Sequence, residues 1–337
     1  MSITAKELAK KLNISATAVS MALNHKPGVS TETRQAIIKA AEEYGFDFSK
    51  IKNQANQGGS IYVIFYKTHN AIMSYTPIFD ELFEGIKNEC QAAGFTARMI
   101  QFFEKTDSLE DCFYDLRGSD CVGIILVGTE IKKDVAEKFL GLNYPMVLLD
   151  SYFESLDCTS VLINNSQGAY AATDYLISLT GTQPGYLRSS YSIRNFEDRQ
   201  EGYFKAIKEN GMSKSRSIIH ELSPSIEDAM ADMLEILDDK AKIARCYFAD
   251  NDIIAIGAMK AFKLRGYRIP EDVAIIGFDN ISESRIIEPS LTTMDVPRLF
   301  LGQTAAKFTI EQINNKVMHS SKVEVATHMI KRLSHCM

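Results

Sequence analysis

The sequence predicts an α/β protein in which three short N-terminal helices precede two doubly wound lobes. Apolar residues recur at helical spacing in three segments within the first 47 of the 337 residues. From residue 61 onward, near-continuous apolar runs alternate with helical patterns, as buried parallel strands and their covering helices require. This alternation restarts after Asn165, which indicates a second α/β unit.

Composition and charge narrow the class of protein. Apolar residues make up 45% and charged residues 24%, as in soluble multi-domain chains. No apolar run reaches the roughly 18 residues of a membrane span, and the start MSITAKELAKK has no secretory pattern, so we expect a cytoplasmic protein without a membrane partner. The net charge is -6, divided as +3 over residues 1–60 (eight basic, five acidic) and -9 over the rest (29 basic, 38 acidic). A basic module on an acidic body suits nucleic-acid binding at one end.

Motifs for catalysis and for metal binding are missing from the sequence. The six cysteines and six histidines are scattered and never reach metal-ligand spacing. No nucleophile elbow, phosphate-binding loop or dinucleotide-binding glycine motif opens a predicted helix. We therefore expect neither an enzyme nor a bound metal or cofactor.

Capping signals mark the starts of the three N-terminal helices. Thr4 and Glu7 have the spacing of a capping box, Ser15 and Ser30 are further N-caps, and Asn13 is a stop signal. Two short helices joined by about three residues, with a third completing the core, form the helix-turn-helix arrangement, whose second helix enters the DNA major groove. Protein-interaction modules also use three short helices, so the pattern alone leaves both functions open.

The residues of this segment also carry a family resemblance. The stretch TAKELAKKLNISATAVSMALNHKPGVSTETRQAIIKAAEEYGF resembles the headpiece of the LacI/GalR family of bacterial repressors. The resemblance implies base reading by Ala16, Thr17 and Met21, and phosphate contacts from Thr4, Ser15, Ser20, Asn24, Ser30 and Thr33. Family members often carry arginine where Met21 stands. Neither Met21 nor Ala16 can pair bidentately with guanine, so we expect an operator that departs from the usual sequence.

Residues 48–60 are polar and rich in Asn, Gln and Gly, which predicts a hinge linker between headpiece and body. In the resembling family this segment folds on DNA into a short helix, and a leucine enters the minor groove. Ala55 occupies that leucine's place. We therefore expect a weaker or differently seated hinge helix.

The body, residues 61–333, reads as two lobes. Strands are predicted at 61–66, 121–128, 145–150, 185–190, 217–222, 244–250 and 273–279, and helices at 79–93, 132–141, 167–179, 198–210, 226–239 and 252–265. We assign residues 61–163 and 292–320 to the first lobe, and residues 164–291 and 321–333 to the second. The segment 323–333 alternates like one edge strand. Two such lobes usually close on a ligand at the carboxyl ends of their strands.

The resemblance continues through the body and implies a ligand site. ADNDIIAIGAMKAF, IPEDVAIIGFDN and PSLTTMDVPRLFLGQTAA are similar to the family's ligand-binding core, which is similar to periplasmic sugar-binding proteins. The implied effector-binding residues are Thr76, Ile78, Phe79, Asp150, Arg199, Leu222, Asn251 and Asp279. Arginine can donate to two hydroxyls at once, carboxylates accept from hydroxyls, and an aromatic ring can stack on a sugar.

Other roles remain open for several of these residues. Phe79 also fits an ordinary core position, and Arg199 and Asp279 also fit an ion pair without ligand contact. Asp150 also fits a cap of the next segment. Asp252 is expected to cap the helix that follows it rather than to bind a metal.

Together these observations predict a dimeric, DNA-binding transcriptional repressor of carbohydrate-utilisation genes. Two headpieces would read a pseudo-palindromic stretch of double-stranded operator DNA, and a sugar-like effector between the lobes would change their affinity for it. Two alternatives stay open: a regulator with a purine or phosphosugar co-repressor, and a solute-binding protein with a vestigial headpiece. The sequence names neither the effector nor any oligomer beyond the dimer.

Overall fold

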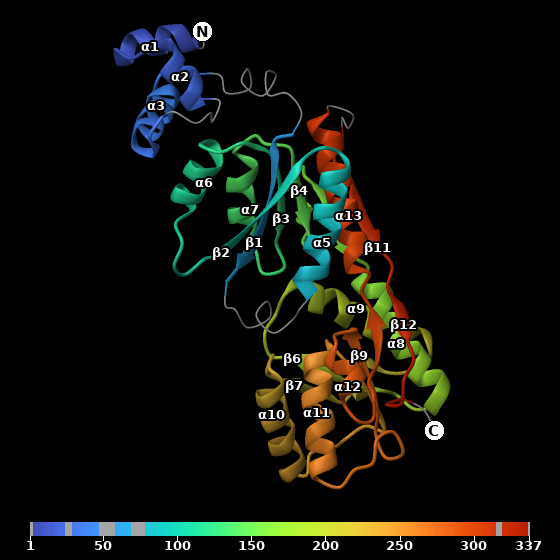
Figure 1. The fold of residues 1–337 in the computed structure, drawn as a ribbon. Helices are drawn as coiled ribbons and strands as arrows, with labels where there is room; N and C mark the ends of the chain where they lie inside the picture. The colour runs from blue at the N-terminus through green and yellow to red at the C-terminus, as the bar shows by residue number, and fades with distance from the viewer. Residues whose placement is uncertain (1–2, 24–28, 47–57, 69–77, 315–318, 336–337) are drawn as a thin grey trace.

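The computed structural model describes residues 3–23, 29–46, 58–68, 78–314 and 319–335, without the side chains of residues 31, 32 and 78. Three helices are followed by a first and then a second α/β lobe (Figure 1). This confirms the predicted fold class. Among the described residues, every helix is too short or too polar to cross a lipid bilayer.

The N-terminal part consists of α1 (Ala5–Leu12), α2 (Ala16–Leu23) and α3 (Thr31–Glu43). The Thr4 hydroxyl accepts from the Glu7 backbone N–H and the Glu7 carboxylate accepts from the Thr4 backbone N–H, so the predicted capping box forms. Asn13 ends α1 in the left-handed conformation, at φ 53°. Leu8 and Val19 are fully buried between the helices.

The first lobe contains a parallel six-stranded sheet in the order β11-β5-β4-β3-β1-β2. Its strands are β1 (Ser60–Lys67), β2 (Thr96–Phe103), β3 (Cys121–Val127), β4 (Met146–Leu149), β5 (Thr159–Ile163) and β11 (Lys322–Val325). Along β1, Val63 packs with α5 (Ile78–Ala92) and α13 (Arg298–Ile313), whereas Ile64 packs with α6 (Leu109–Arg117) and α7 (Lys133–Leu140). Alternate side chains of one strand thus face two helical layers, which explains its continuous apolar sequence.

Helices α5 and α13 cross at unusually short range. A Cβ atom on Gly302 would lie 2.1 Å from the Leu82 carbonyl oxygen, and one on Gly85 would lie 2.1 Å from the Leu299 carbonyl oxygen. Only glycine fits at either contact. This crossing brings the start of α13, at Arg298, beside Glu81 of α5.

The second lobe contains a six-stranded sheet in the order β12-β10-β9-β8-β6-β7, parallel except for β12. The strands are β6 (Gly185–Ser189), β7 (Ile219–Leu222), β8 (Cys246–Ala249), β9 (Ala274–Asp279), β10 (Thr292–Asp295) and β12 (His328–Ile330). The helices are α8 (Asn165–Thr180), α9 (Arg194–Glu209), the 3-10 turn η1 (Lys214–Arg216), α10 (Ile226–Asp238), α11 (Asp252–Leu264) and α12 (Glu283–Ile286).

Strand pairing corrects the expected division between the lobes at two places. β10 pairs with β9 and therefore belongs to the second sheet, although residues from 292 were assigned to the first lobe. β11 pairs with β5 and belongs to the first sheet, although residues from 321 were assigned to the second. The single edge strand expected at 323–333 is two strands, because the chain crosses between the sheets after β11. The sheet to which each strand belongs is decided by its backbone pairing with strands distant in the sequence. The alternation of apolar residues within the segment does not reveal that pairing.

Candidate functional site

A cavity of about 60 Å³ lies between the two lobes. Its polar lining follows the ends of parallel strands: Thr129 after β3, Asp150 after β4, Asn251 after β8 and Asp279 at the end of β9. Arg199 enters the same cavity from α9. The carboxyl ends of strands from both sheets therefore converge on one cleft, as α/β folds favour for ligand binding.

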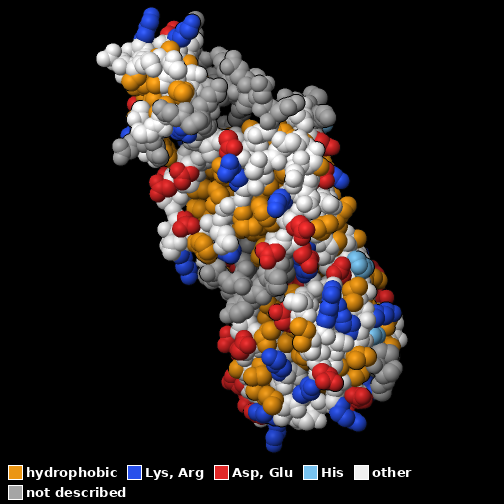
Figure 2. Space-filling view, viewed as in Figure 1, with side chains coloured by type: hydrophobic (Ala, Val, Ile, Leu, Met, Phe, Trp, Pro, Cys, Tyr) orange, Lys and Arg blue, Asp and Glu red, His pale blue; other side chains and the backbone are white. Residues whose placement is uncertain are grey.

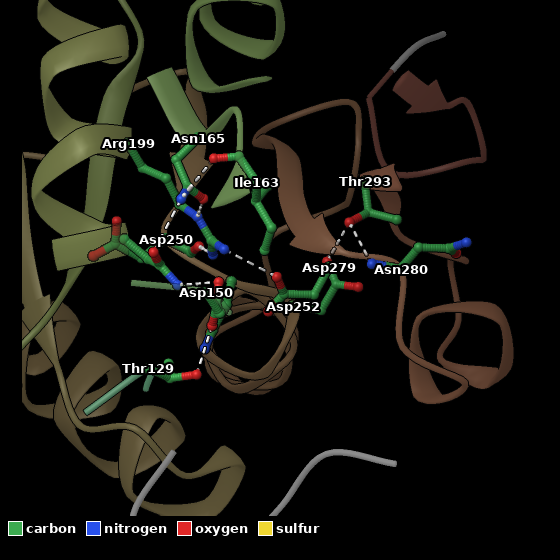
Figure 3. Close-up of polar contacts among 12 residues, drawn as sticks. Thr129, Asp150, Ile163, Asn165, Arg199, Asp250, Asp252, Asp279, Asn280 and Thr293 are labelled. Carbon is green, nitrogen blue, oxygen red and sulfur yellow. Dashed lines mark hydrogen bonds and ion pairs between the residues drawn. The ribbon is translucent and has the colours of Figure 1, made fainter. Parts of the chain in front are cut away.

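Arg199 connects several elements of the cleft, although its side chain is only 3% exposed (Figure 3). Its Nε donates to the Asn165 side chain at 2.9 Å, its Nη1 donates to the Asp250 main-chain oxygen, and its Nη2 donates to Asp279 Oδ1 at 3.1 Å. The Phe278 ring centroid lies 3.7 Å from the guanidinium carbon. A guanidinium has five N–H groups, so these three hydrogen bonds leave one N–H on each Nη unused.

Asp150 and Asp279 both have left-handed backbone conformations, at φ 63° and 107°. Such conformations are costly for residues other than glycine and tend to occur at functional sites. Asp150 accepts from Thr129 Oγ1 at 2.5 Å and from Asn195 Nδ2 at 2.9 Å. Burial raises the pKa of both carboxyls, against the lowering effect of Arg199. The Asn195–Asp150 hydrogen bond also joins the lobes, because Asn195 lies on α9.

The carboxylates on either side of Asn251 stabilise the fold around the cleft. Asn251 itself caps α11 by accepting from the Ile254 N–H at 2.9 Å, so the cap expected at Asp252 is one residue earlier. Asp252 is fully buried and accepts from Thr293 Oγ1 at 2.5 Å and from the Ile281 N–H at 3.0 Å. Asp250 accepts from the Tyr186 hydroxyl and from the Ser189 N–H. Burial raises the pKa of Asp250 to about 7.

The apolar wall of the cleft differs from the expectation at one position. Phe79 lines the cavity and makes an edge-to-face contact with Phe65 at 5.3 Å. Leu222 does not line it, since its side chain is fully buried in the core of the second lobe. Alternation along β7 turns Leu222 inward, and Pro224 lines the cavity instead. Thr76 and the side chain of Ile78 lie outside the described residues.

Five of the expected effector residues therefore line one cavity: Phe79, Asp150, Arg199, Asn251 and Asp279. Sequence reasoning missed Thr129, Asn195 and Arg298, which also line it. Thr129 directly follows a predicted strand, so its position was a usable signal. Arg298 follows β10, a strand that the apolar pattern did not predict.

The N-terminal helices present the expected DNA-contacting residues in two ways. Ala16, Thr17 and Ser20 are exposed on α2, and Met21 is partly exposed beside them. The expected phosphate contacts Thr4, Ser15 and Ser30 accept from backbone N–H groups in the first turns of α1, α2 and α3, and Thr33 is exposed near Ser30. Asn24 and Ala55 lie outside the described residues. Helix α2 thus exposes a short, nearly uncharged surface.

Comparison with known proteins gives matches along the whole chain. The model described as "Bacterial regulatory proteins, lacI family" matches residues 4–47, and the model described as "Periplasmic binding protein-like domain" matches residues 173–335. The NTD biosynthesis operon regulator NtdR of Bacillus subtilis is 30% identical, over 98% of this chain and 99% of that protein. The ribose operon repressor of Halalkalibacterium halodurans is 28% identical, over 98% and 96%. The PurR repressor of Mannheimia succiniciproducens is 27% identical, over 98% of each.

Solved structures give the same picture of the fold. A LacI family transcriptional regulator from Enterococcus faecium, with bound ribose, has a TM-score of 0.69 and 26% identity, over 82% of this chain and 98% of that one. The lac repressor dimer bound to operator has a TM-score of 0.70 over 100% of both chains, at 19% identity. The likeness extends over the helical N-terminal part as well as the two lobes.

Proposed function

This chain belongs to the LacI family of bacterial regulatory proteins, and on that premise we propose that it is a repressor whose affinity for operator DNA is controlled by a small sugar. One observation supports a sugar as the effector: Asp150 from the first lobe, and Arg199 and Asp279 from the second, line a single cavity. Carboxylates and a guanidinium together accept from and donate to hydroxyl groups. The protein would act in the cytoplasm, on DNA, and not as an enzyme.

The lining of the cleft favours a neutral polyol over the alternatives. No lysine lines the cavity in the described part of the chain, and Arg199 already faces the Asp279 carboxylate. Arg298, the other arginine of the lining, lies 3.5 Å from Glu81 Oε2. A phosphosugar would therefore meet two carboxylates and two arginines that already have acidic partners, and a purine offers fewer hydroxyl donors to the carboxylates. The ribose operon repressor and the ribose-bound E. faecium regulator, both above 25% identity, support a sugar of this class.

Control of DNA binding follows from the connection between the lobes. The chain crosses between the two sheets three times, after β5, β10 and β11. A cavity of about 60 Å³ is far smaller than the roughly 300–1,000 Å³ of typical ligand pockets, so a sugar requires the lobes to shift. The ligand can then favour one arrangement only by its difference in affinity between them. In a homodimer on a pseudo-palindromic operator, such a shift would alter the spacing of the two α2 helices.

Mobility-shift assays against DNA upstream of the protein's own gene test the proposal. We expect sequence-selective, salt-sensitive binding that weakens when a sugar identified by thermal-shift screening is added. Binding that shows no sequence preference would favour the solute-binding alternative. A purine or sugar phosphate that strengthens operator binding would favour the co-repressor alternative.

Substitutions on the headpiece separate base reading from phosphate contact. We expect Met21→Ala to weaken operator binding roughly fivefold and to relax discrimination at one base pair, since it removes an apolar contact to a base. Thr33→Ala should instead weaken binding to all sequences by a similar factor, because phosphates carry no sequence information. Measuring both variants on the operator and on single-base variants of it distinguishes the two. Equal effects on specificity would contradict the assigned roles.

A further inference from the structure

A second, larger cavity, of about 340 Å³, lies beside the sugar cleft. Asn280, Ser282 and Arg285 line it from the second lobe, and Glu81 and Arg298 line it from α5 and α13 of the first. Figure 3 shows Asn280 on the side of Asp279 opposite Arg199. We call this space the arginine cavity. It shares Arg298 with the sugar cleft, and residues of both lobes line it.

Arg298 is the residue shared by the two cavities. Its side chain is 6% exposed, its Nη2 donates to the Asp279 main-chain oxygen, and its Nη1 lies 3.5 Å from Glu81 Oε2. Its Nε is buried and has no hydrogen-bond partner among the described residues. A buried N–H without a partner on a charged group is costly, so this atom lacks an acceptor that a ligand could supply.

Two arginines, Arg285 and Arg298, and one carboxylate, Glu81, are the charged residues that line the arginine cavity in the described part of the chain. Arg285 is exposed, and Arg332, outside the lining, donates from its Nη2 to Asn280 Oδ1 at 2.5 Å. Burial, and to a lesser degree the charge of Arg285, lowers the pKa of Arg332. Glu81 is the single carboxylate that lines the cavity in the described residues, and its side chain is 63% exposed. An incoming anion therefore meets two guanidinium groups and one exposed carboxylate in the lining, while Asp295 and Glu283 accept from the lining Asn280 and Ser282.

We propose that the arginine cavity binds a phosphate group, either as inorganic phosphate or as the monoester of a small metabolite, at a site distinct from the sugar cleft. Guanidinium groups recognise phosphate oxygens through paired N–H donors, and Arg285 and Arg298 both line this cavity. The Asn280 amide and the Ser282 hydroxyl also belong to the lining, where they are hydrogen-bonded to Asp295, Arg332 and Glu283. The volume also admits the organic part of a small monoester.

Phosphate bound here is coupled to the sugar cleft through Arg298. That side chain holds the main-chain oxygen of Asp279, whose carboxylate pairs with Arg199 in the cleft. A phosphate that binds Arg298 in place of Glu81 changes the position of the guanidinium group that donates to the Asp279 main-chain oxygen. Each ligand then changes the affinity for the other by the same factor, as linkage requires.

Isothermal titration of the full-length protein tests the site, with inorganic phosphate and a hexose 6-phosphate as probes at constant ionic strength. We expect Arg285→Gln to weaken phosphate binding about tenfold or more, through loss of a charged donor. The control Arg216→Gln removes an exposed arginine elsewhere on the second lobe and should leave binding unchanged. Glu81→Gln should tighten binding several-fold, because it removes the competing carboxylate. Equal affinities in the Arg285→Gln and Arg216→Gln variants would overturn the proposal.

The two probes and a cleft variant distinguish the sources of the phosphate. Saturable binding of inorganic phosphate supports the free anion, whereas binding of the monoester alone supports a phosphorylated metabolite. In either case Asp150→Asn, which alters the cleft, should not abolish binding. Loss of monoester binding in Asp150→Asn, or simple competition by the unphosphorylated sugar, would mean one ligand spanning both cavities and would refute a separate site. If neither probe binds at concentrations up to about 10 mM, the proposed phosphate site would be refuted as well.

Discussion

Replacing Arg199 by alanine is expected to abolish the sugar response of operator binding and to weaken sugar binding by about a hundredfold or more. The variant removes the two guanidinium N–H groups that remain for the ligand, and each charged hydrogen bond contributes about 1.5–3 kcal/mol. It also removes the partner of Asp279 Oδ1 in the wall of the cleft. DNA binding in the absence of sugar should persist, because α2 lies in a separate part of the chain.

The same substitution should lower the stability of the second lobe. It leaves the Asp279 carboxylate, the Asn165 side chain and the Asp250 main-chain oxygen without a donor that Arg199 now supplies. Breaking a buried ion pair from one side costs about 3–5 kcal/mol. Denaturant unfolding therefore has to accompany the binding measurements, so that a loss of the sugar response is interpreted only for variants that are shown to be folded.

A matched control and a milder variant keep this test decisive. Arg194→Ala removes an arginine from the same helix, where it pairs with Asp198 at the surface, and should change neither stability nor sugar response appreciably. Asp279→Asn keeps the shape of the cleft wall while removing one charge, and should also reduce the response. A normal sugar response in a folded Arg199→Ala protein would refute the site assignment.

Stability should fall as the pH rises from about 4 to about 7, with Asp250 as a main contributor. Burial raises the pKa of Asp250 to about 7 in the folded protein, from 3.8 without burial. Between these values the folded state holds a proton that the unfolded state has lost, so each rise in pH favours unfolding. Below about pH 4 and above about pH 7 the two states carry the same proton number at this site. The full change is on the order of 4 kcal/mol.

Asp250→Asn isolates this contribution. An amide can still accept from the Ser189 N–H and can donate to the Tyr186 oxygen, but it does not titrate. Denaturant unfolding at pH 5 and pH 8 should show a smaller loss of stability in the variant than in the wild type. Asp238→Asn is the control: Asp238 is exposed and Arg265 lowers its pKa, so it does not titrate in this window. Identical pH dependence in wild type and Asp250→Asn would contradict the prediction.

Local sequence was sufficient for the N-terminal helices and for the fold class. The capping box of Thr4 and Glu7 is made by groups three residues apart, so spacing alone predicts it and the structure confirms it. The alternation of apolar strands and helices similarly predicted the two doubly wound lobes, because each buried strand carries its own signal. Asp150 and Asp279 were identified through the family resemblance, and both stand where such a strand ends.

Strand neighbours and the buried face of each strand were decided only by the tertiary structure. β10 and β11 exchanged lobes relative to the expectation because pairing with β9 and β5 is a contact between chain segments, invisible in either segment alone. Leu222 turned into the core and Asn195 reached Asp150 across the lobes for the same reason. The sequence by itself thus determined which elements form, since their signals are local. The partners of Arg199 and Arg298, and the two cavities that these residues line, depend on residues up to 217 positions apart and emerged only from packing.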